Sequence, residues 1–178
     1  MINDKELKIL EAALKLFNSN GFHGSPTSKI ASEAGVSNGT LFHYFKSKEN
    51  LILELYRHIK EDINAFIFEG YLSNETCKDR MKHLYMRTLL WAQDHVKEFA
   101  YIQSFQASPF NELLLTSEDA ESSKLYYELI DEAIKLRIIH NRPVFFLITL
   151  MFSQINGVHQ YLISQQSFSE KEILKFAD

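Results

Sequence analysis

The sequence predicts an all-helical protein, because its apolar residues recur at helical spacing and its turn-forming residues are scarce. Only three Pro and six Gly occur in 178 residues, so turns are few and the elements between them are long. No stretch keeps the alternation of apolar and polar residues that a half-buried strand shows. Capping residues divide the chain into about nine helices.

Four helices are expected before residue 70. The first starts at Asn3, which forms a capping box with Glu6, and ends before Gly21, which accepts the left-handed conformation that follows a helix. Thr27, Ser37 and Ser47 are expected to cap the second, third and fourth helices. The second and third helices are short, and the fourth is long.

The remaining helices are expected after residue 70. Asn74 and Ser117 are candidate caps, and Pro143 suits the first turn of the longest apolar helix. A helix over residues 99–105 breaks at Ser108-Pro109, and Ser169 can cap a last short helix.

Charge and composition narrow the class of protein. Residues 1–60 contain eight Lys and Arg against six Asp and Glu, whereas residues 61–178 contain eleven against seventeen. A mildly basic head on an acidic body suits local contact with phosphate. Cys77 cannot form an internal disulfide, the N-terminus does not read as a signal peptide, and the apolar run 144–152 is too short to cross a bilayer. We therefore expect a cytoplasmic protein without a membrane segment.

Enzyme motifs are not found in the sequence. The seven His and the single Cys show no metal-binding spacing such as His-Glu-x-x-His or Cys-x-x-Cys. There is no glycine-rich phosphate loop and no nucleophile elbow. The sequence favours a protein without catalytic residues, metal or cofactor.

Residues 27–45 have the spacing of a helix-turn-helix. Ala31 is small where the second helix would cross the first, Gly35 would form the turn, and Leu41 would anchor the second helix in the core. Each residue alone is common, but together with the caps at Thr27 and Ser37 they indicate the motif. The second helix, residues 38–45, would enter the major groove of DNA.

Polar residues on this second helix suit base edges, and residues on its flanks suit phosphates. Thr40 and His43 can bond base edges, whereas Tyr44 and Lys48 can reach phosphates. The full set assigned to DNA is Thr27, Ser28, Ser37, Asn38, Gly39, Thr40, His43, Tyr44, Lys46 and Lys48. The alternative interpretation makes them solvated surface residues, with Tyr44 partly buried. We expect Leu41, Phe42 and Phe45 to belong to the core.

Residues 27–51, TSKIASEAGVSNGTLFHYFKSKENL, closely resemble the signature of the TetR family of bacterial repressors, and ILEAALKLF at 9–17 with Gly21-Phe22 resembles its first helix. Two departures are small: Asn38 stands where a basic residue or Pro is frequent, and Phe42 where Tyr is frequent. The resemblance implies a DNA-binding head over residues 1–46 and a helical ligand-binding and dimerisation domain over residues 47–178. It also implies a homodimer that binds a palindromic DNA operator and is released by a small ligand.

The helix that begins at Pro143 is the best candidate for dimerisation. It is apolar on most sides, so it must be buried on most sides, and Gly157 would let a partner helix approach. The residues assigned to the interface are Ile148, Phe152, Ile155, Val158, His159 and Leu162. The alternative is a central core helix of a monomer.

Aromatic residues outside the head are candidates for a ligand pocket, although most cores are lined in the same way. The candidates are Phe66, Trp91, His95, Phe99, Gln103, Phe105, Tyr126 and Tyr127. The acidic body hints at a mainly apolar or cationic ligand.

The predicted function is a ligand-responsive transcriptional repressor. One alternative is an all-helical interaction or carrier protein whose helix-turn-helix binds another protein. A second alternative is an architectural DNA-binding protein without a ligand.

Overall fold

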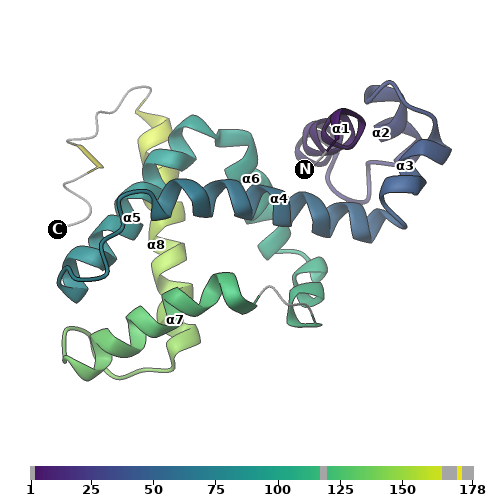
Figure 1. The fold of residues 1–178 in the computed structure, drawn as a ribbon. Helices are drawn as coiled ribbons and strands as arrows, with labels where there is room; N and C mark the ends of the chain where they lie inside the picture. The colour runs from purple at the N-terminus through teal and green to yellow at the C-terminus, as the bar shows by residue number, and fades with distance from the viewer. Residues whose placement is uncertain (1–2, 117–119, 166–171, 174–178) are drawn as a thin grey trace. The chain divides into compact units, whose positions relative to one another are not determined.

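The structure, a computed structural model, describes residues 3–116, 120–165 and 172–173, and the regular secondary structure in these ranges is helical. The elements in order are α1 (Asp4–Asn20), α2 (Thr27–Glu33), α3 (Asn38–Tyr44), α4 (Lys48–Phe68), α5 (Cys77–Asp94), α6 (Val96–Gln106), the 3-10 helix η1 (Pro109–Thr116), α7 (Ala120–Lys135) and α8 (Val144–Ser164). The predicted all-helical fold with about nine helices is confirmed (Figure 1). The predicted caps at Ser117 and Ser169 lie outside the described residues.

Local capping interactions set the ends of the N-terminal helices. Asn3 Oδ1 accepts hydrogen bonds from the amides of Lys5 and Glu6 at 2.9 and 3.1 Å, which pairs two amides that a helix start leaves without partners. Ser47 Oγ accepts from the amide of Asn50 at 3.0 Å and caps α4 in the same way. Two predicted caps are shifted: Pro26 precedes α2 in place of Thr27, and Thr76 caps α5 in place of Asn74.

The chain forms two compact units, and the first comprises residues 1–61 and 96–117. It contains α1 to α3, most of α4, α6 and η1. Ile9, Ile30 and Leu41 are fully buried at its centre. Tyr101 of α6 is also fully buried, and its hydroxyl donates to the carbonyl of Ile52 in α4 at 2.7 Å. Therefore α6 is part of the core that supports the first three helices.

Aromatic side chains fill much of the space between α1, α6 and η1. The Phe22 ring lies 5.3 Å from Phe17, 5.7 Å from Tyr101 and 5.3 Å from Phe110, measured between ring centroids. Such edge-to-face and tilted pairs are favourable beyond the area they bury. Asn18 of α1 also donates to the carbonyl of Lys97 at 2.9 Å. These contacts tie α1 directly to α6.

The second unit comprises residues 62–95 and 118–178, and its described helices are the end of α4 together with α5, α7 and α8. Buried apolar residues from all of these helices, such as Ile63, Leu89, Ile130 and Ile155, make its core. No described helix is both apolar enough and long enough to cross a membrane. The predicted domain boundary between residues 46 and 47 stays a prediction.

Two polar interactions connect helices inside the second unit. His159 of α8 bonds the carbonyl of Ala92 in α5 at 3.1 Å, and burial lowers the pKa of this histidine against the opposing effect of that bond. The guanidinium of Arg80 in α5 pairs with the carboxylate of Glu132 in α7. These interactions join α5 to the helices on either side.

Candidate nucleic-acid interface

A tight turn holds α2 and α3 in a fixed arrangement, visible as two short helices beside α1 in Figure 1. The amide of Val36 donates to the carbonyl of Ala31 at 2.9 Å, and the amide of Gly35 donates to Ser32 at 3.1 Å. Gly35 has φ = 68°, in the left-handed region where side chains are disfavoured. This turn is the reason the sequence has a glycine at this position.

The buried face of α3 consists of Leu41, with Phe45 directly after the helix. Residues on the opposite side of a helix lie two or five positions away, and here these are Gly39 and His43, both exposed. Thr40 lies beside them and is partly exposed. The edge of α3 that faces away from the core is therefore polar and accessible, as direct reading of bases requires.

Ser37 and Thr40 act together at the start of α3. Ser37 Oγ accepts from the amide of Thr40 at 3.0 Å and lies 2.9 Å from the Thr40 hydroxyl. The cap therefore fixes the orientation of the Thr40 side chain, and its methyl group remains available for an apolar contact. The predicted cap at Ser37 is confirmed.

Tyr44 and Phe42 lie on the two flanks of α3. Tyr44 is partly exposed, and its ring packs edge-on against His43 with centroids 5.4 Å apart. Its hydroxyl accepts a hydrogen bond from Asn3 Nδ2 at 2.7 Å. Phe42 was predicted to be a core residue, and this prediction is wrong, because 42% of its surface is exposed. The core contacts only the 41/45 edge of α3 and leaves the neighbouring position 42 uncovered.

The start of α4 contributes Lys48, with Lys46 just before it. Lys46 is exposed and Lys48 is partly exposed. The carboxylate of Glu49 accepts from its own amide and from the Ser47 hydroxyl, and these bonds lower the pKa of that carboxyl group. Glu49 therefore occupies part of the start of α4, beside the lysine that we assigned to a phosphate.

Each residue that we assigned to DNA binding has an accessible surface. Six are exposed on or beside α3 and at the start of α2: Ser28, Ser37, Asn38, Gly39, His43 and Lys46. Thr27, Thr40, Tyr44 and Lys48 are partly exposed. Their role in binding DNA stays a prediction.

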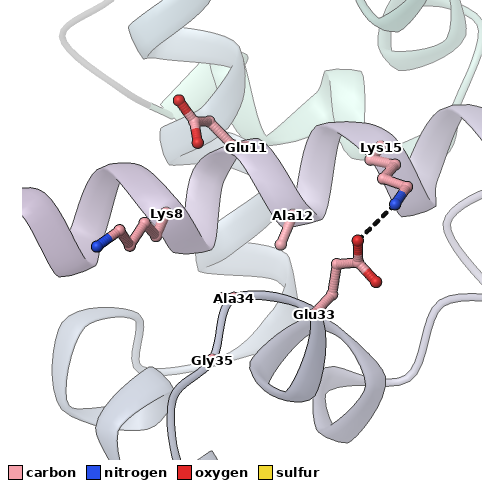
Figure 2. A pocket seen from close by; sticks show the side chains of 7 residues that line it. All are labelled: Lys8, Glu11, Ala12, Lys15, Glu33, Ala34 and Gly35. Carbon is pink, nitrogen blue, oxygen red and sulfur yellow. Dashed lines mark hydrogen bonds and ion pairs between the residues drawn. The ribbon is translucent and has the colours of Figure 1, made fainter.

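A shallow groove on the same unit is lined by none of these residues. It has a volume of about 390 Å³ and runs between α1 and the turn after α2. Figure 2 shows Lys15 of α1 paired with Glu33 of α2 across it, while Ala12 faces Ala34 and Gly35. Its lining contains both acidic and basic side chains, so the groove does not favour a polyanion.

The candidate pocket residues divide between the two units. Phe99, Gln103 and Phe105 belong to α6 in the first unit, where Phe105 is fully buried and stacks on Tyr56 with centroids 4.1 Å apart. The second unit contains Phe66, Trp91, His95, Tyr126 and Tyr127. Each of these residues therefore remains a separate candidate for ligand binding, and they are not treated as the lining of one pocket.

Three of the pocket candidates in the second unit already interact with other side chains. The Trp91 and His95 rings stack in parallel with centroids 4.5 Å apart, and Trp91 Nε1 donates to Asp62 Oδ2 at 3.1 Å. Phe66 lies under the guanidinium of Arg87, which is 3.7 Å from the ring centroid. Tyr126 is buried, whereas Tyr127 is exposed.

Three residues assigned to the dimer interface are core residues of the protomer. Ile155, His159 and Leu162 are buried against the rest of the second unit, so they cannot meet a partner directly. Ile148, Phe152 and Val158 are partly exposed. The pattern identified an apolar helix correctly, but both of its sides are apolar, and the sequence did not show which side the protomer covers.

Comparison with known proteins agrees with this geometry. Residues 9–55 match the family model described as bacterial regulatory proteins, tetR family. A putative TetR family transcription regulator from Shewanella sp. PV-4 has the same fold over 98% of this chain and 94% of its own, with 28% identity and a TM-score of 0.87. Residues 9–55 therefore match the TetR family, and the described residues share the fold of a TetR family regulator.

Two regulators from Bacillus subtilis extend the comparison. The fatty acid metabolism regulator protein of Bacillus subtilis (strain 168) is 32% identical over 131 residues, which are 71% of this chain and 64% of that protein. The chain thus spans less than two thirds of that relative. The transcriptional regulator FadR from Bacillus subtilis, in complex with stearoyl-CoA, shares the fold with a TM-score of 0.65 and 22% identity, over 96% of each chain.

Two features of this region were not predicted from the sequence. The first is the contact between Asn3 and Tyr44, which are 41 positions apart. The second is the exposure of Phe42. Its place beside the Leu41 and Phe45 face could have marked it as a flank position, whereas no local signal connects Asn3 to Tyr44.

Proposed function

We propose that this protein is a TetR-family transcriptional repressor that binds operator DNA as a homodimer and is released by a small ligand. The accessible polar edge of α3, with Gly39, Thr40 and His43 opposite the buried Leu41, is the observation that supports DNA binding most directly. Tyr44 and Lys48 lie on the flank, where the phosphates of a bound duplex would pass. The helix-turn-helix supplies one head, and a palindromic operator needs two.

Lys48→Ala tests the assignment of the phosphate contact. We expect it to weaken binding to duplexes of every sequence and to reduce the slope of log K against log salt by about one for each head. Lys78→Ala is a matched control, because Lys78 is an exposed lysine in the first turn of α5. Fluorescence anisotropy across a salt series measures both variants. An unchanged salt slope for Lys48→Ala would remove this residue from the interface.

The exposed face of α8 supports a homodimer. Phe146, Leu150, Ser153, Gly157 and Tyr161 recur at spacings of three and four residues, so they share one side of the helix. Phe146, Leu150 and Tyr161 expose 47, 49 and 53% of their surfaces. A Cβ added at Gly157 would meet no atom within 4 Å, so a second helix can approach there. We propose that this face, in place of the Ile155 side, meets a second copy of the chain.

Buried polar atoms in the second unit support a ligand. Among the described residues, Asn64 Oδ1 and Tyr85 Oη are buried without a hydrogen-bond partner, and so is Arg80 Nε. An unpaired buried polar atom costs about 1–3 kcal/mol. A ligand that supplied partners for these atoms would recover this cost. The fatty acid regulators among the similar proteins, and the stearoyl-CoA bound to one of them, suggest a long-chain acyl-CoA.

Lys60 favours an anionic group on the ligand, whereas the sequence suggested a mainly apolar or cationic ligand. Lys60 is partly exposed, and partial desolvation of its ammonium group lowers its pKa to about 8. No described residue pairs with this group. A thioester, phosphate or carboxylate would each interact with this donor, and the latter two would also neutralise it.

Stearoyl-CoA is expected to release the protein from its operator, and Lys60→Met tests the anchoring group. Met keeps the length of the side chain and removes the charge, so Lys60→Met should need about tenfold more stearoyl-CoA for half-release while binding DNA as tightly as the natural chain. The operator is first selected from random duplexes, and release is followed by anisotropy. Coenzyme A without an acyl chain is the control ligand. Equal release of the variant and the natural chain would exclude the Lys60 anchor.

A further inference from the structure

The side-chain amide of Asn3 accepts two hydrogen bonds, and these determine the direction of the hydrogen bond that it donates. Its Oδ1 accepts from the amides of Lys5 and Glu6, so the side-chain oxygen must face the start of α1. The amide nitrogen is then turned toward Tyr44 and lies 2.7 Å from its hydroxyl oxygen. An amide NH₂ group can only donate, so the Tyr44 oxygen must accept.

Among the residues that the structure describes, the proton of the Tyr44 hydroxyl has no acceptor. A tyrosine hydroxyl has one proton to donate, and its oxygen is already used by Asn3. Tyr44 is partly exposed on the flank of α3, and its ring is held edge-on by His43. The proton is therefore free to point outward from the flank, where an acceptor on DNA would lie.

We infer that Asn3 is a positioning residue for DNA binding: its amide fixes the Tyr44 hydroxyl so that this hydroxyl donates its proton to a backbone phosphate. The inference rests on the proposed DNA-binding function. Because the hydroxyl already accepts one hydrogen bond, its donor strength toward the phosphate increases through polarisation of the chain of bonds. Asn3 thus links the start of α1 to the contact surface of α3.

The test must separate positioning from helix capping. Asn3→Ser keeps a side-chain oxygen that caps helices about as well as Asn, but it is too short to reach Tyr44 and has no amide. Tyr44→Phe removes the hydroxyl and keeps the ring. The double variant completes the cycle, which isolates the coupling between the two side chains. Thermal unfolding should be unchanged for Asn3→Ser.

Binding is measured by anisotropy with a fluorescein-labelled duplex of mixed sequence at low salt, because phosphate contacts act on any sequence. We expect Tyr44→Phe to weaken binding about fivefold and Asn3→Ser about threefold. The double variant should bind no more weakly than Tyr44→Phe. The salt slope should stay constant, because neither residue carries a charge.

The outcomes separate this inference from the proposed function. If the natural chain does not bind the duplex, both are overturned. If the natural chain binds and Asn3→Ser binds equally well, only the inference fails. It also fails if Asn3→Ser weakens binding by the same factor in the Tyr44→Phe background, because Asn3 would then act independently of the hydroxyl.

Discussion

Leu150→Arg is expected to turn the proposed dimer into a monomer and to lower operator affinity by at least about a hundredfold. Leu150 lies at the centre of the exposed apolar face of α8, between Phe146 and Ser153. An arginine there would place an unpaired charge in the contact between two copies, which is strongly unfavourable. Two linked heads bind a palindrome far more tightly than one head, so the loss of the dimer is amplified in DNA binding.

Sedimentation measures the oligomeric state, and anisotropy with the selected operator measures affinity. Leu136→Arg is the matched control, because Leu136 is also an exposed leucine but lies directly after α7 and outside this face. It should remain dimeric. Ile155→Arg cannot serve as a test, because Ile155 is buried and a charge there would unfold the second unit. A Leu150→Arg protein that sediments as a dimer would place the interface on another surface.

Short-range interactions explain why the helix starts could be predicted from the sequence. Asn3, Ser37 and Ser47 each bond backbone amides within three residues, as predicted. The two shifted starts are also local: Pro26 and Thr76 lie one or two residues from the predicted caps. A cap and its partners share one stretch of sequence, so their geometry follows from residue type and spacing.

The features that could not be predicted from the sequence depend on packing between residues that are far apart in the chain. Helical periodicity shows which residues share a face, but an α8 that is apolar on both sides gives no indication of which side its own protomer covers. Phe42 was misassigned for a related reason, since an apolar residue beside a core face can be either covered or exposed. The grouping of α6 with the head depends on Tyr101 and Ile52, which are 49 positions apart.

Tyr101→Ala is expected to lower the free energy of unfolding of the first unit by about 4 kcal/mol, because it removes a large buried aromatic side chain. Tyr101 is fully buried, and its ring contacts Phe17, Phe22 and Phe105. Burial raises the pKa of its hydroxyl well above the usual range, so the group remains a neutral donor to the Ile52 carbonyl. Tyr101→Phe keeps the ring and should cost only about 1 kcal/mol.

Urea unfolding followed by circular dichroism gives the overall loss of stability, and hydrogen exchange shows where it falls. If α6 is part of the core beneath the DNA-binding helices, Tyr101→Ala should reduce the protection of amides in α1 and the first half of α4 together. Tyr127→Ala, at an exposed tyrosine of α7, should change stability by less than about 1 kcal/mol. Comparable losses for the two variants would mean that α6 adds little to the head. A large loss of stability for Tyr101→Ala would show that α6 stabilises the core of the first unit. A change in the position of α6 would then also affect α1 and α4.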